Sequence, residues 1–214
     1  MRSRLLVLLV ASTGIFSQPL SLGVKGGLRT TDDFQYAAIS ESRRYLVGPT
    51  VAVSLPFGFG VEFDALYSRQ GYTLNWSTSL YSSYTREADN VWQFPLVGRY
   101  QLPIAHVSPF VETGWSPRIA HGFQDFRGSF LSNLNPATYS VSSGRKHADW
   151  PTTHGLVVGG GVEIPFGKLR VAPELRYTRW NRPVISGTFA DGPSYTTSQN
   201  QVDISVGFRW RVRE

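Results

Sequence analysis

Eight stretches of this chain alternate between apolar and polar residues with a period of two, and no other feature restricts the possible folds as strongly. Successive side chains of a β-strand point to opposite faces, so each stretch is predicted to be a strand whose faces meet different environments. An all-β fold is the direct consequence. The predicted strands are residues 21–29, 44–55, 59–72, 91–101, 107–118, 154–164, 168–180 and 201–213.

Two kinds of connection alternate between these strands. Three connections are short and contain a proline. The others are long and rich in Ser, Thr, Asn, Asp and Gly, and they are predicted to be loops. Strict alternation of the two kinds indicates up-and-down hairpins with all turns at one end and all loops at the other. The short turns are residues 56–58, 102–106 and 165–167, and the long loops are residues 30–43, 73–90, 119–153 and 181–200.

The charges of the predicted strands fall on one face of each strand. In residues 168–180, Leu175 and Tyr177 lie on the apolar face, whereas Glu174 and Arg176 lie on the opposite face. A secreted, soluble, lipocalin-like barrel that binds a small apolar ligand would show the same alternation with its apolar face inward. Periodicity alone therefore leaves that alternative open.

Three further features favour a barrel that spans a membrane. The polar face mixes opposite charges with Gly, Ala and Ser, which suits a narrow packed interior. Most strands have the length of about 9–12 residues that a tilted strand needs to cross a bilayer. Aromatic residues collect near strand ends, as in the girdles of membrane barrels. The predicted girdle residues are Tyr45, Phe59, Tyr72, Trp92, Tyr100, Trp115, Tyr177, Trp180 and Trp210.

The predicted fold class is an eight-stranded antiparallel up-and-down transmembrane β-barrel. Backbone groups in hydrocarbon must be paired within the protein, so a β protein crosses a membrane only as a closed cylinder. An extra hairpin within residues 128–143 would raise the number to ten strands. Eight strands leave a lumen that side chains fill, which argues against a wide pore.

The charges are then expected inside the cylinder. Charged groups that leave water must be paired and hydrogen-bonded, and the six basic and six acidic residues on these faces balance one another. A structural role is favoured over ion gating. The predicted interior ion network consists of Lys25, Glu62, Asp64, Arg99, Glu112, Glu163, Arg170, Glu174, Arg176, Asp203, Arg209 and Arg211.

The first residues have the order of a secretory signal: a basic start, about ten apolar residues and then small or polar ones. We predict a signal peptide over residues 1–17 and one barrel domain over residues 18–214, exported to the bacterial outer membrane. An uncleaved anchor is the alternative, although the apolar run is short for a bilayer span.

Composition excludes several other functions. The chain has no cysteine, so disulfides and thiolate metal sites are absent. The formal net charge is +6, but the basic residues are scattered among acidic ones, which argues against nucleic-acid binding. No cofactor is expected. The predicted partners are outer-membrane lipid and an extracellular ligand or protein that binds the long loops, and the chain is expected to be a monomer.

A lipid-modifying hydrolase with residues at the barrel rim is an alternative function. His121, His154, Ser116, Asp125 and Asp149 supply the residue types of a hydrolytic site, but their spacing shows no triad. We therefore predict no catalytic residues.

A metal site is not predicted either. His147, Asp149 and His154 match no known ligand spacing. Residues 159–161 are all glycine but lack the strand-to-helix context of a phosphate-binding loop. They are interpreted as positions that let a strand coil tightly or leave room for a neighbouring interior side chain.

The long segments carry aromatic residues, which anchor many recognition surfaces. The working hypothesis is a structural or interaction role at the cell surface; the alternative is that these rings pack on one another above the rim. They are Tyr81, Tyr84, Phe123, Phe126, Phe130 and Tyr139.

Several strand motifs resemble a known family. WQFPLVGRYQL from Trp92, SPFVETG from Ser108, GGGVEIPFG from Gly159, PELRYTRW from Pro173 and the closing QVDISVGFRW resemble small bacterial outer-membrane β-barrels of the OmpA/OmpX-like type. Such barrels often end on an aromatic residue, whereas here Arg211, Val212, Arg213 and Glu214 follow Trp210. The resemblance implies the barrel architecture over the mature chain and does not specify an activity.

Overall fold

The computed structural model describes residues 20–32, 34–35, 39–40, 42–102, 104, 107–131, 139–188 and 194–212. The predicted signal peptide, residues 1–17, lies outside the described residues. Nearly all described residues belong to β-strands. None of the helical turns in this part of the chain is long and apolar enough to cross a bilayer.

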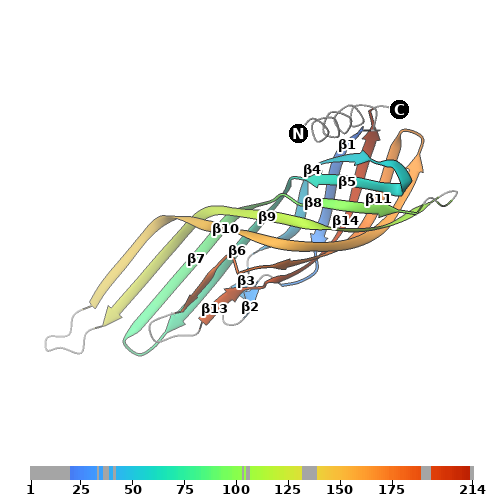
Figure 1. The fold of residues 1–214 in the computed structure, drawn as a ribbon. Helices are drawn as coiled ribbons and strands as arrows, with labels where there is room; N and C mark the ends of the chain where they lie inside the picture. The colour runs from blue at the N-terminus through green and yellow to red at the C-terminus, as the bar shows by residue number, and fades with distance from the viewer. Residues whose placement is uncertain are drawn as a thin grey trace, which may run out of the picture.

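Eight strand positions pair in antiparallel fashion and close into a ring (Figure 1), which confirms the predicted fold class. The ring closes where β1 pairs with β14, from Ser21 opposite Arg211 to Arg29 opposite Asp203. The positions are β1 (Leu20–Arg29), β4 (Arg43–Ser54), β5 (Phe59–Asp64) with β6 (Leu66–Ser77), β7 (Tyr81–Gln93) with β8 (Leu96–Gln101), β9 (Ser108–Leu131), β10 (Tyr139–Phe166), β11 (Leu169–Trp180) and β14 (Asn200–Arg211).

Four short strands lie outside the ring positions. β3 (Ile39–Ser40) pairs with β6. The other three form a small separate sheet in the order β12, β13, β2. Their bounds are β2 (Phe34–Gln35), β12 (Ser186–Thr188) and β13 (Ser194–Thr197).

Two of the eight positions are each split into two strands. Ala65 separates β5 from β6, and its backbone N–H donates to the carbonyl of Pro49 at 3.0 Å. Phe94 and Pro95 separate β7 from β8. Proline has no N–H for the ladder, so an interruption at Pro95 is expected.

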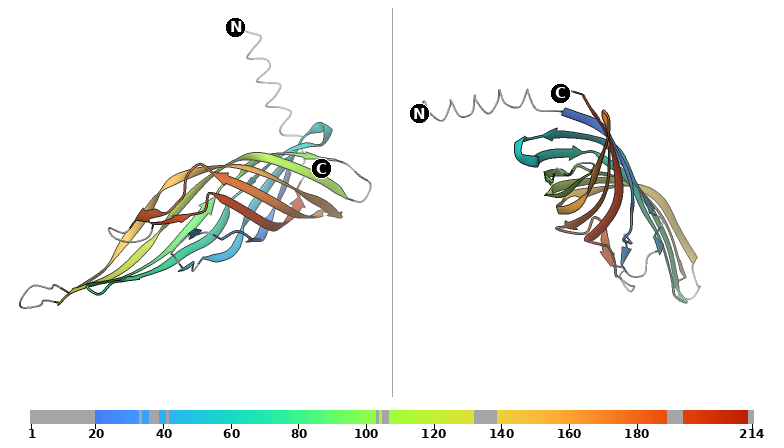
Figure 2. Two further views of the ribbon diagram at one scale, coloured as in Figure 1. Left: turned by 90° about the horizontal axis from the view of Figure 1, so that it is seen from below. Right: turned by 90° about the vertical axis from the view of Figure 1, so that its right-hand side faces the viewer.

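The prediction of loops over residues 73–90 and 119–153 is wrong, because most of these residues are strands. β6 and β7 pair as far as Ser77 opposite Ser82, and β9 and β10 pair as far as Leu131 opposite Tyr139. The Ser, Thr and aromatic residues of these segments suit pleated strands as well as loops. β6, β7, β9 and β10 therefore continue beyond the barrel as a four-stranded extension (Figure 2), and the ring keeps eight strands.

The short turns lie at the opposite end from this extension. Pro56–Gly58 forms a single 3₁₀ turn in which Phe57 and Gly58 have φ values of 62° and 81°. Gly58 suits this left-handed backbone because it has no Cβ. The turn predicted at residues 165–167 starts two residues later in the structure. β10 continues through Phe166, and the turn begins at Gly167, which has a φ value of 63°.

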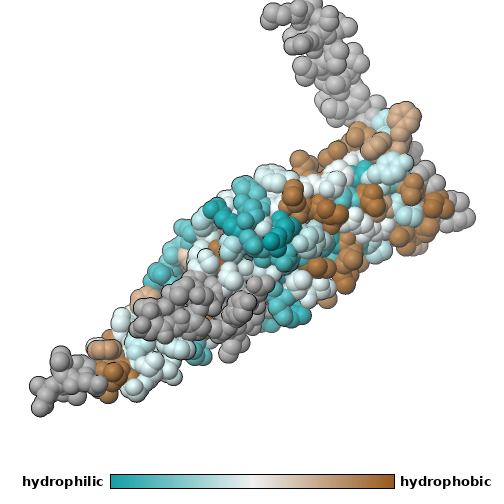
Figure 3. Space-filling view, turned by 60° about the horizontal axis from the view of Figure 1, so that its bottom comes forward, coloured by the Kyte–Doolittle hydropathy of each residue, from teal (hydrophilic) through white to brown (hydrophobic). Residues whose placement is uncertain are grey.

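The outer surface of the barrel is apolar. Leu96, Leu175 and Phe208 are each about half exposed, whereas Glu174 and Arg176 are buried. On the face shown in Figure 3, brown apolar residues gather over the end that holds the barrel, while most of the extension is white or teal. The apolar faces of the strands therefore point outward and the charged faces inward.

Exposed aromatic side chains form two girdles around this surface. The girdle at the end with the short turns contains Phe59, Tyr100 and Trp210. Tyr72 and Trp180 were predicted as girdle residues, and this prediction is wrong because both are fully buried inside. On their strands, Tyr72 and Trp180 belong to the alternate set of residues whose side chains point into the lumen. The girdle at the end with the extension contains Tyr45, Trp92, Trp115 and Tyr177, with half-buried Tyr67 beside them.

An apolar plug fills the lumen at the end with the extension. Val184 and Ile185 are buried there against a cluster that includes Leu74 and Val91. The backbone N–H groups of Val184 and Ile185 donate to Thr197 Oγ1 at 2.8 and 3.2 Å. These bonds hold the segment after β11 inside the rim.

Candidate functional site in the barrel lumen

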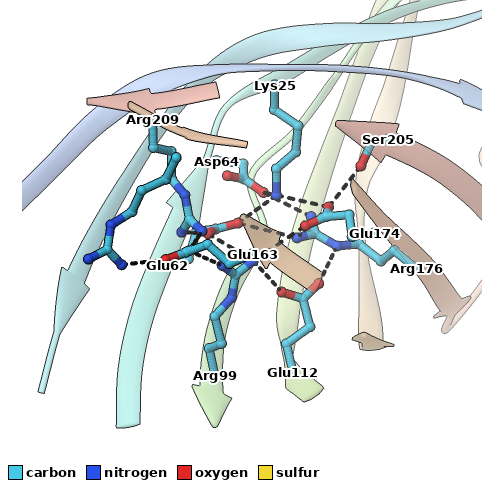
Figure 4. A network of polar contacts seen from close by, with 11 residues as sticks. Lys25, Glu62, Asp64, Arg99, Glu112, Glu163, Glu174, Arg176, Ser205 and Arg209 are labelled. Carbon is cyan, nitrogen blue, oxygen red and sulfur yellow. Dashed lines mark hydrogen bonds and ion pairs between the residues drawn. The ribbon is translucent and has the colours of Figure 1, made fainter. Parts of the chain in front are cut away.

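The lumen holds a dense cluster of ion pairs between the two girdles, which we call the ion cluster (Figure 4). Lys25 of β1 lies at its centre: Nζ is 2.5 Å from Glu62, 3.0 Å from Asp64 and 2.9 Å from Glu174. These carboxylates come from β5 and β11. Because all these residues have inward parity on their strands, closing the ring brings their charges together.

Arg176 joins four carboxylates from three strands. Its guanidinium lies 2.9 Å from Asp64, 2.9 Å from Glu112, 3.2 Å from Glu174 and 3.6 Å from Glu62. The side chain is 4 % exposed. A cation this deeply buried is tolerated only because its partners also supply hydrogen bonds.

Two further arginines complete the centre of the ion cluster. Arg99 lies 3.1 Å from Glu62 and 3.3 Å from Glu112, and its guanidinium stacks 3.7 Å above the ring of Phe110. Arg209 lies 2.5 Å from Glu62 and also pairs with Glu163.

Glu163 and its partners lie toward the end with the short turns. Glu163 pairs with Arg170 as well as with Arg209. A cavity of about 20 Å³ borders these residues, together with Glu62 and Arg99. Since one water needs about 10–15 Å³, this cavity holds about one water and is no wide passage.

Ion pairs join ten of the twelve residues predicted for the interior network. Arg211 is half-buried and pairs with no described carboxylate. Asp203 is buried in the lumen but pairs with Arg29, which was not predicted, at 3.7 Å. Six basic residues therefore face six acidic ones in the ion pairs of the described lumen.

Three carboxylates of the ion cluster lie close enough to suggest a metal site. Ligand oxygens of Glu62, Glu112 and Glu174 are within 4.8 Å of one another, the one such group among the described residues. The cations of Lys25 and Arg176 already lie between them. These side chains neutralise the carboxylates, so the geometry is that of an ion-pair network.

Glycine provides room for the ion cluster. A Cβ added at Gly159 would lie 2.9 Å from Glu112 Oε1, and one at Gly161 would lie 2.2 Å from the carbonyl oxygen of Pro173. Larger residues at these positions would displace the neighbouring strand or the charged side chain. The distance at Gly159 fits the interpretation that glycine leaves room for an interior side chain, whereas the distance at Gly161 reflects the close approach of the neighbouring strand's backbone.

A second polar group, Glu87 and Asp89 of β7, lies beyond the extended-end girdle, and we call it the carboxyl pair. Both side chains are fully buried. Trp150 Nε1 donates to Glu87 at 2.8 Å and to Asp89 at 3.2 Å. Tyr72 and Gln124 donate to the other oxygen of Glu87 at 3.0 and 2.9 Å. All these donors are neutral.

The carboxyl pair lies outside the apolar band. Asp89 is three residues beyond Trp92 on β7, and outward-facing Asn90 between them is polar and exposed. Burial, together with the hydrogen bond and charge of Glu87, raises the pKa of Asp89 to about 8. Asp89 is therefore mostly protonated at neutral pH.

Sequence reasoning missed the carboxyl pair because residues 73–90 were taken as a loop. Glu87 and Asp89 have the same parity as Val91 and Gln93, which lie in the predicted strand. Starting that strand four residues earlier would therefore have placed both acids inside. The polar composition of this stretch hid its period.

The structure does not assemble the residues considered for hydrolysis. Ser116 is buried with inward parity, whereas His121 and His154 are exposed on the outer face. His154 stacks on Trp115 with centroids 5.2 Å apart. Asp125 is held by Arg145 at 2.6 Å. No described nucleophile, base and carboxylate of this set lie in mutual contact.

The histidines considered for metal binding also separate. Asp149 lies between His121 and His147, with Nδ1 to oxygen distances of 2.7 and 3.2 Å. The hydrogen bond from His121 lowers the pKa of Asp149. These three side chains are exposed on the extension, and His154 lies apart on Trp115. His121, Asp149 and His147 therefore form a surface hydrogen-bonded group.

No protein-family model matches the sequence, and the search of curated proteins finds no match. Solved outer-membrane barrels resemble the fold at low identity. Neisserial surface protein A is 15% identical, with a TM-score of 0.39, and the match covers 90% of this chain and 96% of that chain. The N-terminal β-barrel domain of Pseudomonas aeruginosa OprF is 12% identical, with a TM-score of 0.34 and coverages of 90% and 97%.

A further similar structure is Ail, the attachment invasion locus protein of Yersinia pestis, in complex with the heparin analogue sucrose octasulfate. It is 12% identical, with a TM-score of 0.36, and the match covers 90% of this chain and 97% of that chain. Scores this low carry no information on function, which is inferred below from the geometry of this chain.

Proposed function

We propose that this protein is an integral outer-membrane β-barrel with a side-chain-filled lumen and a structural or interaction role at the cell surface. One observation carries the proposal: between the two girdles the outer surface exposes apolar residues, while the charged residues of the same strands lie inside. A soluble barrel has the opposite arrangement. The outer membrane is proposed because small bacterial β-barrels with an apolar outer surface are found in that membrane.

The exposed apolar surface is too large for a protein in water. Burying one Leu, Val or Phe side chain contributes about 1.5–3 kcal/mol, and side chains of this kind are exposed at each of the eight ring positions; Leu28, Val47, Val111 and Leu156 are examples. Hydrocarbon would cover them without any partner. If this structure were a soluble, lipocalin-like barrel, its apolar outer surface would face water and its ligand site would be lined by charges.

The lumen supports a role other than wide-pore transport. Between the ion cluster and the carboxyl pair, Gln93 and Gln201 exchange hydrogen bonds at 3.2–3.3 Å, and Arg118 stacks 3.8 Å over Trp180. Together with the plug at Ile185, these layers fill the cylinder. Its interior resembles a polar core more than a channel.

The extension is the surface proposed to meet partners outside the cell. Tyr84 and Phe123 are exposed on it, and Tyr139 is 68 % exposed. Rigid aromatic side chains on paired strands give contact area at a small entropic cost. The predicted loop aromatics thus lie on strands, which is a correction of the sequence interpretation. A catalytic role is not proposed, because Ser116 faces away from both rim histidines.

Folding into lipid and fractionation test the proposal together. A folded membrane barrel migrates faster than its boiled form on a denaturing gel, and the native protein should be found with outer-membrane markers. Planar-bilayer recordings of the same folded protein should show no large steady openings. Recovery in the soluble fraction, with identical boiled and unboiled migration, would contradict membrane insertion.

A further inference from the structure

Two histidines and one aspartate meet on the outer face of the extension. His121 of β9 lies directly opposite Asp149 of β10 in the register, and His147 lies two residues before Asp149 on the same face of β10. Nδ1 of His121 is 2.7 Å from Asp149 Oδ1, and Nδ1 of His147 is 3.2 Å from Asp149 Oδ2. Both imidazoles therefore turn toward one carboxylate.

Strand pairing sets the spacing of these three residues. Leu131 of β9 donates its backbone N–H to Leu80, and β9 then pairs with β7 in one unbroken register, so alternate residues of β9 as far as His121 bond toward β7. His121 and Asp149 are thus a non-hydrogen-bonded pair with Cα atoms roughly 4.5 Å apart. His147 stands roughly 7 Å along β10 from Asp149, since a strand rises about 3.3 Å per residue. Ligands on paired strands are held more precisely than ligands on loops.

Asp149 differs from the other carboxylates of the described surface and lumen in its partners. Asp125, on the same outer face, is held by Arg145 at 2.6 Å. The carboxylates of the ion cluster are neutralised by cations such as Lys25 and Arg176. Among the described residues, no Lys or Arg pairs with Asp149, which meets the two imidazoles. Its charge is therefore accessible to a metal cation.

We propose that His121, His147 and Asp149 bind a zinc ion at the surface of the extension. Imidazole nitrogens and a carboxylate oxygen are common ligands of Zn²⁺, and water takes the fourth position where a protein supplies three ligands. Ca²⁺ and Mg²⁺ fit less well, because both prefer sites made entirely of oxygen atoms.

Binding requires the two imidazoles to move closer together. With bonds of about 2.0–2.2 Å, neighbouring ligand atoms of a tetrahedral zinc site lie roughly 3.3–3.6 Å apart. The nitrogen–oxygen distances of 2.7 and 3.2 Å are already near this range, but the ligand atoms of all three side chains do not lie within 4.8 Å of one another. His121, His147 and Asp149 are 54 %, 56 % and 65 % exposed, so rotation of the imidazoles displaces little of the protein.

The site is also open to the medium at the edge of the sheet. β11 pairs with β10 only from Gly155 onward, so Asp149 has β9 on one side and no described strand on the other. Sequence reasoning grouped His147 and Asp149 with His154, the next histidine along the chain. His121 is 28 residues from Asp149, and the strand register brings the two together.

Zinc binding by matched variants tests the inference. The full chain is produced without a histidine tag, folded in detergent micelles and titrated with Zn²⁺ alone by isothermal titration calorimetry. The test variants are H121N, H147N and D149N. The control is H154N, because His154 is exposed on the outer face but stacks on Trp115, apart from the other two histidines.

The wild type and H154N should bind one Zn²⁺ per chain with equal affinity. Each test variant should bind at least roughly tenfold more weakly, because even a change in a group that only supports a ligand costs about 10–100-fold. No binding by the wild type, equal affinity in the wild type and the test variants, a loss confined to one test variant, or an equal loss in H154N would each overturn the inference.

The gel shift separates this inference from the proposed membrane barrel. Each preparation is checked for faster migration before boiling. If the shift is present and the wild type binds no Zn²⁺, the metal site alone fails. Zinc binding that is lost in the three test variants, in preparations without the shift, would support the metal site and contradict the membrane barrel.

Discussion

The ion cluster and the carboxyl pair are both buried in one lumen, yet their charges are neutralised in different ways. Glu62 in the ion cluster meets Lys25, Arg99 and Arg209 within 3.1 Å. Among the described residues, the donors that bind Glu87 and Asp89 are the neutral side chains of Trp150, Tyr72 and Gln124. The first group balances its charge with cations and the second with a proton.

The difference follows from position along the barrel. Between the girdles, eight strands surround the lumen, and basic residues of β1, β8, β11 and β14 reach the centre. The pair lies at the start of the extension, where β6, β7, β9 and β10 contribute aromatic and amide groups. Arg69, Arg86 and Asp149, which are charged residues of β6, β7 and β10 in the extension, are exposed on its outer face.

The largest expected effect is the loss of a cation from the ion cluster. Arg176→Met leaves Asp64, Glu112 and Glu174 short of one shared positive charge, so unfolding in lipid should become easier by about 3–5 kcal/mol. Urea unfolding in vesicles, followed by the gel shift, measures this change.

Arg179→Met is the matched control for that substitution. Arg179 lies on the same strand, is exposed and donates to Asn200 at 2.6 Å. Its loss should change the free energy of unfolding by no more than about 0.5 kcal/mol. Equal effects of the two substitutions would mean that the ion cluster contributes no special stability.

A smaller effect, and one that depends on pH, is expected for Asp89→Asn. In the unfolded chain an Asp carboxyl loses its proton near pH 4, whereas burial raises the pKa of Asp89 to about 8 in the folded protein. Its contribution to stability is therefore complete below about pH 4 and is lost as the pH rises through about 8. The amide introduced by Asp89→Asn does not titrate in this range, so the variant should lack this decline.

Unfolding midpoints across that pH range measure the difference between the two proteins. Asp149→Asn serves as control, because the pKa of Asp149 is lowered by its hydrogen bond from His121. Its contribution is lost as the pH falls, which is the opposite sign. A decline with rising pH that persists unchanged in Asp89→Asn would show that the carboxyl pair is not held by a proton.

The smallest effect is expected for Trp150→Phe. The substitution keeps an aromatic ring, although a smaller one, and removes the one N–H that donates to both Glu87 and Asp89. Loss of a buried hydrogen bond should cost about 1–3 kcal/mol. In an Asp89→Asn background the cost should be smaller, since the amide can donate to Glu87 itself. A double-mutant cycle measures that coupling.

Much of the fold could be predicted because parity is a local property. The period-two pattern in β11 and β14 places Glu174, Arg176 and Arg209 on one face without knowledge of any partner. Prediction failed where local chemistry was ambiguous. The residues of β7 from Tyr81 to Asn90 are polar enough for a loop, and only their pairing with β6 and β9 makes them a strand.

The candidate site could be predicted in membership but not in arrangement. The sequence indicates which charges face inward. It does not indicate that Arg176 contacts four carboxylates, or that Arg29 rather than Arg211 forms an ion pair in the lumen. Such contacts depend on the register between strands that are far apart in the chain. The carboxyl pair also depends on register, since it and its hydrogen-bond donors come from β6, β7, β9 and β10.

By itself, the sequence determined that each strand has an apolar face and a charged face, because successive side chains of a pleated strand point in opposite directions wherever the strand lies. Only the closed tertiary structure decided which side would be inside. It also decided which charges would meet cations, because ring closure and strand register set the distance between charges on different strands.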